Sequence, residues 1–147
     1  MKILTTPDPF LRHTAKKLVN YDKKTQDQVA QMSQILMHTS NPKGVGLAAT
    51  QVGLDKRLFI LNLEEKIHIY INPEFEPIGD KKLSQVYKKK KNRWLEGCLS
   101  IPKIWGFVDR YYQIKLKYLS PVKEGSVWKL LAKEDVLGEK FASFQSF

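Results

Sequence analysis

Apolar residues recur with helical spacing between residues 25 and 39. Val29, Met32 and Leu36 are three and four residues apart, so a helix would place them along one face. Residues 41–44 read Asn-Pro-Lys-Gly, and a proline followed by a glycine is typical of the end of a helix. The pattern therefore predicts one amphipathic helix over residues 25–39.

A second pattern, the alternation of apolar and polar positions, is typical of β-strands with one covered face. It is clearest at residues 67–72, where three isoleucines alternate with His68 and Tyr70. Residues 112–118 repeat it with tyrosine, isoleucine and leucine against glutamine and lysine. We predict strands over residues 57–63, 67–72, 95–101, 112–118 and 127–132, with turns at 77–80 and 121–126.

These elements favour one class of fold. Strands outnumber helices, and no internal repeat, linker or break in composition divides the 147 residues. We therefore expect a single α+β domain over residues 1–147, with mostly antiparallel strands around one helix.

Composition narrows the environment in which the protein works. The chain is 42% apolar and 27% charged, which is ordinary for a soluble globular protein. No apolar run approaches the roughly 18–20 residues that span a bilayer, the N-terminus lacks the pattern of a signal peptide, and a single cysteine cannot form an internal disulfide. We expect a cytoplasmic protein without a membrane partner.

Positive charge is concentrated in one segment. The formal net charge is +10, and residues 81–93 contain seven basic residues and no acidic one, whereas the rest of the chain has 18 basic and 15 acidic residues. Such a segment is either a solvated lysine-rich loop or a contact for an anionic partner such as RNA or the ribosome surface. No aromatic-interleaved RNA-reading motif accompanies it, and we do not expect DNA as a partner.

Two segments carry residues that can do chemistry. Residues 44–53 are small and read as a flexible loop, with two glycines two positions apart that let the backbone approach a ligand closely. Near the end of that loop, Gln51 offers an amide donor. Residues 96–100 read Glu-Gly-Cys-Leu-Ser, and Cys98 is a metal ligand, a nucleophile or an inert small apolar residue. Neither segment alone decides between these roles.

Together, the two segments resemble the peptide deformylase family. The words GVGLAATQVG and, about 45 residues later, EGCLSIP resemble motifs of that family in order and spacing. The opening PDPFLRHTAKKL is also similar to its N-terminal segment, and the order of helix, glycine loop, strands, EGCLS and further strands agrees. The resemblance runs from residue 5 to about residue 120.

The resemblance implies a metallo-hydrolase that removes the formyl group from formyl-methionine at the start of new polypeptides. The family's metal is a divalent ion, Fe²⁺ or Zn²⁺, held by one cysteine and two histidines with a water in the fourth position. Carried over by motif, Cys98 is the thiolate ligand, and the Gln51 side-chain amide and the Leu99 backbone N–H stabilise the oxyanion. The substrate peptide is expected to meet the backbone of three further residues, Val45, Gly46 and Gly97.

The family's third motif, a helix with His-Glu-x-x-His, does not occur in these 147 residues. That motif presents two imidazoles on one helix face, with a glutamate that handles the proton of the water. The histidines here are His13, His38 and His68, all before Cys98. We expect His38 to pack partly buried and His68 to be exposed, and we assign no role to His13. The resemblance thus describes a deformylase-like domain without its C-terminal motif helix, inactive or weakly active as it stands.

Two positions near the second motif also bear on the site. Trp105 stands where many relatives carry an arginine, and an indole, having no charge, would instead stack or fill a pocket wall. Arg110 matches a basic position of the family, where it either contacts the substrate peptide or has a structural role.

Three hypotheses follow for the function. The first is a peptide deformylase that acts on formyl-methionine peptides. The second is a non-catalytic deformylase-like module that binds the ribosome through residues 81–93. The third is a fragment that does not fold stably.

Overall fold

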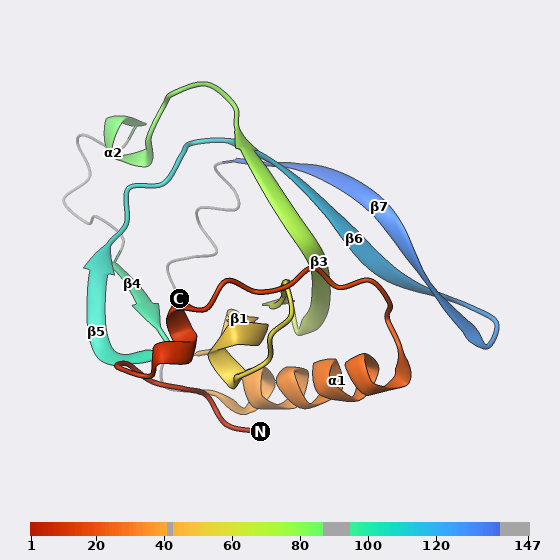
Figure 1. Ribbon diagram of the computed structural model, residues 1–147. Helices are drawn as coiled ribbons and strands as arrows, with labels where there is room; N and C mark the ends of the chain where they lie inside the picture. Colours follow the sequence, from red (N-terminus) through yellow and green to blue (C-terminus); the bar gives the residue numbers. More distant parts are fainter. Residues whose placement is uncertain (41–42, 87–94, 139–147) are drawn as a thin grey trace.

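The structure is a computed structural model that describes residues 1–40, 43–86 and 95–138. It contains one long helix, a five-stranded sheet in the order β1-β2-β3-β6-β7 and a separate hairpin of β4 and β5 (Figure 1), and every strand pair is antiparallel. The predicted α+β class is therefore confirmed. The elements are η1 (Pro9–Arg12), α1 (Lys23–His38), β1 (Gly46–Ala48), η2 (Ala49–Val52), β2 (Leu58–Leu63), β3 (Lys66–Pro77), α2 (Leu83–Val86), β4 (Leu95–Cys98), β5 (Ile101–Phe107), β6 (Ile114–Glu124) and β7 (Val127–Leu137).

Helix α1 confirms the helical pattern. It begins after Asp22, whose carboxylate accepts hydrogen bonds from the backbone N–H and the hydroxyl of Thr25 at 2.8 and 2.6 Å. Such an N-cap satisfies a backbone donor that has no partner within the helix. The buried side chains are those of the predicted apolar stripe, together with Thr25.

The core lies between α1 and the first strands of the large sheet. Met32 and Leu36 of α1 are fully buried and belong to one cluster with Leu47, Ile60 and Ile71. Packing of the amphipathic helix face against β1 and β2 therefore holds the segment that leads into the glycine loop.

The polar face of β3 is exposed at one position and covered at the next. His68 is exposed, as expected. Tyr70 is buried because its ring stacks on Phe59 at 4.7 Å between centroids and contacts Tyr118 at 4.6 Å. The polar face of the predicted strand is thus partly covered by aromatic rings from the two neighbouring strands.

One predicted strand and one predicted turn differ from the structure. Residues 95–101 do not form one strand, because β4 ends at Cys98 and β5 begins at Ile101. The turn predicted at residues 121–126 is shorter, since β6 runs to Glu124 and the chain reverses at Gly125 with φ of 60°. Pro121 is tolerated in β6 because the pairing with β3 ends before it. At Pro121, β6 pairs with β7 on one side only, so a backbone N–H towards the other side is dispensable.

The glycine-rich segment is not the flexible loop that its composition suggests. Its residues form β1, which pairs with β2, and then η2, which is followed by Gly53 with φ of 78°.

Among the described helices, none is long and apolar enough to cross a bilayer. The residue pair 41–42, in the predicted helix stop, lies outside the described residues, as does most of the basic segment, 87–93.

Candidate functional site

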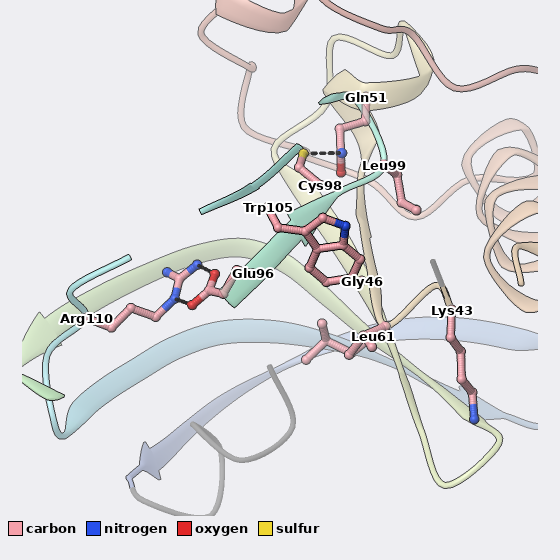
Figure 2. Close-up of a pocket in the computed structure, with 11 residues that line it drawn as sticks. Lys43, Gly46, Gln51, Leu61, Glu96, Cys98, Leu99, Trp105 and Arg110 are labelled. Atoms are coloured by element: carbon pink, nitrogen blue, oxygen red, sulfur yellow. Dashed lines mark hydrogen bonds and ion pairs between the residues drawn. The ribbon is translucent and has the colours of Figure 1, made fainter. Parts of the chain in front are cut away.

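The side-chain amide of Gln51 is held in one orientation. Its Oε1 accepts a hydrogen bond from the backbone N–H of Ala48 at 2.9 Å, so its Nε2 must point the other way. There the Nε2 donates to Ser100 Oγ at 3.1 Å and lies 3.8 Å from Cys98 Sγ (Figure 2). The structure therefore brings together two motifs that are 47 residues apart and fixes which end of the amide faces the thiol.

Cys98 lies at an irregular point of the hairpin. Strand β4 pairs in regular register up to Gly97 and Trp105, but Cys98 is opposite Ile101, so the register shifts immediately before the cysteine. The Cys98 side chain is exposed, and the next residue, Leu99, packs against the core. A β-bulge of this kind redirects a side chain away from the regular alternation.

The N-terminal segment joins the two motifs through its main chain. The backbone N–H of Leu4 donates to the carbonyl of Gln51 at 2.7 Å, and that of Thr6 donates to the carbonyl of Ser100 at 2.9 Å. Since Gln51 belongs to η2 and Ser100 follows β4, residues 4–6 hold the two segments side by side.

Gln51 and Cys98 border a cavity of about 260 Å³. The structure places all six predicted site residues on its wall, although their chemical roles stay predictions. Lys43, Leu61, Glu96, Trp105 and Arg110 complete the lining, and the six predicted residues are Val45, Gly46, Gln51, Gly97, Cys98 and Leu99.

Two strands that each have an unpaired edge contribute residues to the cavity wall. Within the described part of the chain, β1 pairs with β2 alone and β4 pairs with β5 alone, so each has an unpaired edge. Gly46 of β1 and Gly97 of β4 both line the cavity. An extended peptide between two such edges can form main-chain hydrogen bonds with either strand.

An ion pair forms part of the cavity wall. Arg110 donates from Nε and Nη2 to the two carboxylate oxygens of Glu96 at 2.7 and 2.6 Å (Figure 2). The hydrogen bond to Glu96 raises the pKa of Arg110. Because the guanidinium is engaged by both oxygens, this geometry favours the structural role over direct contact with a peptide.

The sequence interpretation missed two residues of the site. Ser100 is 4% exposed, and its hydroxyl is the acceptor that holds the Gln51 amide, while Glu96 anchors Arg110. Both stand at the ends of the Glu-Gly-Cys-Leu-Ser word, so their polar side chains beside Cys98 were the available signal.

Known proteins of one family are similar to this chain over most of its length. The family model for polypeptide deformylase matches residues 1–134. A peptide deformylase of Stutzerimonas stutzeri is 34% identical over 136 residues, which cover 90% of this chain and 73% of the relative. The chain belongs to the peptide deformylase family. A peptide deformylase of Natranaerobius thermophilus is likewise 34% identical over 124 residues, covering 84% of this chain and 72% of the relative.

Solved deformylase structures have the same fold. The Plasmodium falciparum peptide deformylase in complex with an inhibitor superposes with a TM-score of 0.74 at 28% identity, covering 97% of this chain and 77% of that one. The Thermotoga maritima enzyme gives 0.73 at 28% identity, covering 98% and 84%. The likeness thus extends over nearly all of this chain.

The donor atoms around Cys98 do not amount to a divalent-metal site. In residues 1–40, 43–86 and 95–138, no group of three or more His, Cys, Asp and Glu side chains lies close enough together to hold an ion. The nearest carboxylate in the cavity wall, Glu96, is already bound by Arg110. A single thiolate provides one of the three protein ligands that a catalytic site of the deformylase kind needs.

The histidines of the chain lie elsewhere. His13 lies 2.8 Å from Asp55, and the hydrogen bonds from Lys16 and then from His13 lower the pKa of the Asp55 carboxyl to about 2. His38 is exposed at the end of α1, with its Nδ1 2.7 Å from the carbonyl of Gln34, so the expectation of a packed, partly buried ring is wrong. The ring follows the last buried turn of the helix and extends past the apolar stripe.

Part of the basic segment is described. The Lys81 ammonium lies 5.1 Å from the centre of the Tyr112 ring, and that of Lys82 lies 3.0 Å from the centre of the Tyr111 ring. These cation–π contacts tie the beginning of the segment to the connection before β6. The other five basic residues, between 88 and 93, lie outside the described residues.

Proposed function

We propose that this chain provides the formyl-peptide-binding part of a deformylase active site in the cavity beside Cys98. The substrate is a polypeptide with an N-terminal formyl-methionine, and the products are formate and the free amine. In that reaction, water oxygen adds to the formyl carbon, the C–N bond breaks, and the amine nitrogen gains a proton. Membership of the peptide deformylase family supports the substrate class.

The orientation of the Gln51 amide is the observation that carries the proposal. With Oε1 engaged by Ala48 and one N–H of Nε2 donated to Ser100, the second N–H is directed towards Cys98 Sγ at the cavity wall. A donor that is aimed in advance stabilises a developing oxyanion more effectively than one that must reorient. We assign this role to Gln51 Nε2, with the Leu99 backbone N–H as the second donor to the formyl oxygen.

The peptide main chain would lie between the two open strand edges. Val45 and Gly46 lead into one edge and Gly97 belongs to the other, and all three border the cavity. Added-strand binding of this kind recognises backbone, so it accepts many nascent sequences as long as the formyl end reaches Cys98.

We further propose that these 147 residues by themselves hydrolyse formyl peptides slowly. Among the described residues, the cavity wall holds the two proposed oxyanion donors, but its one carboxylate, that of Glu96, is paired with Arg110, and no histidine lines it beside Cys98. The purified chain should therefore contain less than one equivalent of iron or zinc by elemental analysis. It should also release little formate from formyl-Met-Ala-Ser.

Fusion of a helix with His-Glu-x-x-His after residue 147 tests the assignment. Both metal content and formate release should rise, and Cys98→Ala in the fusion should lower both, because the thiolate is the ligand that this chain provides. Gln51→Leu in the fusion should reduce kcat by about 10²–10³-fold, as expected for the loss of one oxyanion donor, with metal content unchanged. A fusion that binds metal stoichiometrically and still releases no formate would contradict the proposed function.

The basic segment supports a second candidate, docking on ribosomal RNA. Seven basic residues stand between 81 and 93, and the first two are held in place by tyrosine rings. Binding to ribosomes should then fall steeply between about 50 and 200 mM salt. Replacement of Lys88 to Lys91 by glutamate should abolish it, and unchanged sedimentation with ribosomes would refute this candidate.

A further inference from the structure

We propose that Trp105 selects the substrate by contacting the peptide side chain that lies across Gly97 from it, and that this site favours large apolar side chains. The inference rests on the proposed function, since it takes the formyl peptide to lie along β4. Trp105 belongs to β5 and pairs directly with Gly97 of β4. Its indole lines the same cavity as Cys98 and Gln51 (Figure 2) and is 49% exposed.

The indole of Trp105 packs against the backbone of Gly97. A Cβ placed on Gly97 would lie 3.0, 3.1 and 3.2 Å from the Trp105 ring atoms Cζ3, Cη2 and Cε3. Carbon atoms in ordinary contact are about 3.5–4.0 Å apart, so the six-membered ring occupies the space that any other residue at position 97 would fill. The absence of a side chain at Gly97 is therefore what allows the ring to lie over β4.

In this position, the indole extends towards the open edge of β4. Neighbouring strands lie about 4.8 Å apart, and side chains on the same face of strands two apart are normally separated by the side chain between them. Here the strand between is β4, and Gly97 contributes no side chain. Trp105 thus reaches over Gly97 to the position where a peptide residue paired with that glycine would hold its side chain.

The chemistry of this surface indicates which side chains it prefers. The exposed part of the indole is apolar and aromatic, and the charged pair at this end of the cavity, Glu96 and Arg110, is internally neutralised. Aromatic rings stack on such a surface, and a thioether contacts the ring edge favourably. Because Gly97 directly precedes Cys98, the selected residue is the first or second residue of the formylated peptide.

The test is peptide binding to the 147-residue chain, measured by NMR on ¹⁵N-labelled protein so that turnover is not required. The ligands are formyl-Met-Ala-Ser, formyl-Met-Phe-Ser, formyl-Ala-Ala-Ser and formyl-Ala-Phe-Ser. The indole N–H signal of Trp105 is assigned by its loss in Trp105→Phe. At one of the two varied positions, the larger side chain should bind about threefold to tenfold more tightly than alanine and should move this signal.

Three variants make the result specific. Trp105→Ala should remove the preference at that position while peptides with alanine there bind as before. Gly97→Ala should also weaken the preference although the indole is retained, because the new methyl group displaces the ring. Trp128→Phe is the matched control, since Trp128 lies on β7 against Tyr21 and its loss should leave the preference unchanged. The amide spectrum of each variant shows whether it is folded.

The outcomes separate this inference from the proposed function. If peptides shift the amides of Gly46 and Gly97 but the preference is the same in wild type and folded Trp105→Ala, the role of Trp105 is refuted and the binding site stands. If no formyl peptide shifts any cavity amide of the folded chain, the proposed function fails, and the selection by Trp105 fails with it.

Discussion

The loop before β1 contains a glycine, Gly44, whose replacement should destabilise the fold because a new side chain would contact backbone. Gly44 is buried, and its N–H donates to the carbonyl of Thr39 at 2.9 Å. A Cβ at this position would lie 2.7 Å from both the carbonyl oxygen and the Cδ1 atom of Leu36. Leu36 is fully buried in α1, so neither atom can move without displacing the helix or the loop.

The magnitude for Gly44→Ala follows from two opposing effects. Overpacking typically costs about 1–3 kcal/mol, and contact with a backbone oxygen places this case in the upper half of that range. The alanine also restricts the unfolded chain, which offsets about 0.4–1 kcal/mol. We expect a net loss of roughly 1–2.5 kcal/mol, which for a domain of this size lowers Tm by about 2–10 °C.

Two other glycines provide graded controls in the same thermal unfolding experiment. At Gly46 the new Cβ would meet Leu61 Cδ2 at 2.9 Å, the end of a side chain that can rotate away, so the loss should be smaller. At Gly106 no atom lies within 4 Å, and alanine should change stability by less than about 0.5 kcal/mol. Equal Tm values for Gly44→Ala and Gly106→Ala would refute the steric reasoning.

Three further variants test interactions elsewhere in the fold. Asp55→Asn should flatten the acid dependence of the free energy of unfolding in urea between about pH 4 and pH 2. A carboxyl whose folded pKa is lowered to about 2 contributes stability above its unfolded pKa and loses that contribution as the pH falls. An unchanged pH profile would contradict this. Asn72→Ala should lower the free energy of unfolding in denaturant by about 2–4 kcal/mol, because the Asn72 side-chain amide bonds both the N–H and the carbonyl of Leu18 at 2.8 Å and the φ of Asn72 is 51°. A loss below 1 kcal/mol would exclude Asn72 as a stabilising contact for Leu18. Glu96→Gln should lower stability by about 1–2 kcal/mol because one charge of the bidentate pair with Arg110 is lost, and a double-mutant cycle with Arg110→Gln that gives no coupling would count against the pair.

The elements that can be predicted well from the sequence are those whose own residue pattern determines their form. The spacing of Val29, Met32 and Leu36 is enough to place α1, because an amphipathic helix buries one stripe. Alternation places β3 and β6 for the same kind of reason. In contrast, β1 is three residues long and owes its form to pairing with β2, so small, glycine-rich residues gave no local sign of a strand.

The site, like the fold, can be predicted from the sequence only in part. The two motif words identify the residues that meet at the cavity, but not how they are held. That Ser100 orients Gln51 depends on a contact across 49 residues, and that Trp105 rests on Gly97 depends on the register of a hairpin with an irregularity next to Cys98. Register and long-range hydrogen bonds are properties of the folded chain, so residue types alone do not fix them.

The position of Gln51 relative to Cys98 is set by main-chain contacts as much as by the motifs themselves. Gln51 follows the edge strand of the large sheet, whereas Cys98 belongs to the hairpin, and in the described residues no strand is shared between the two sheets. What joins them at the site is the bond from Gln51 to Ser100 and the two bonds from Leu4 and Thr6. Backbone donors and acceptors are the same for every residue type except proline, so the opening segment can hold the site together with little demand on its side chains. The geometry of the proposed oxyanion donor therefore depends on residues that contribute no chemistry of their own.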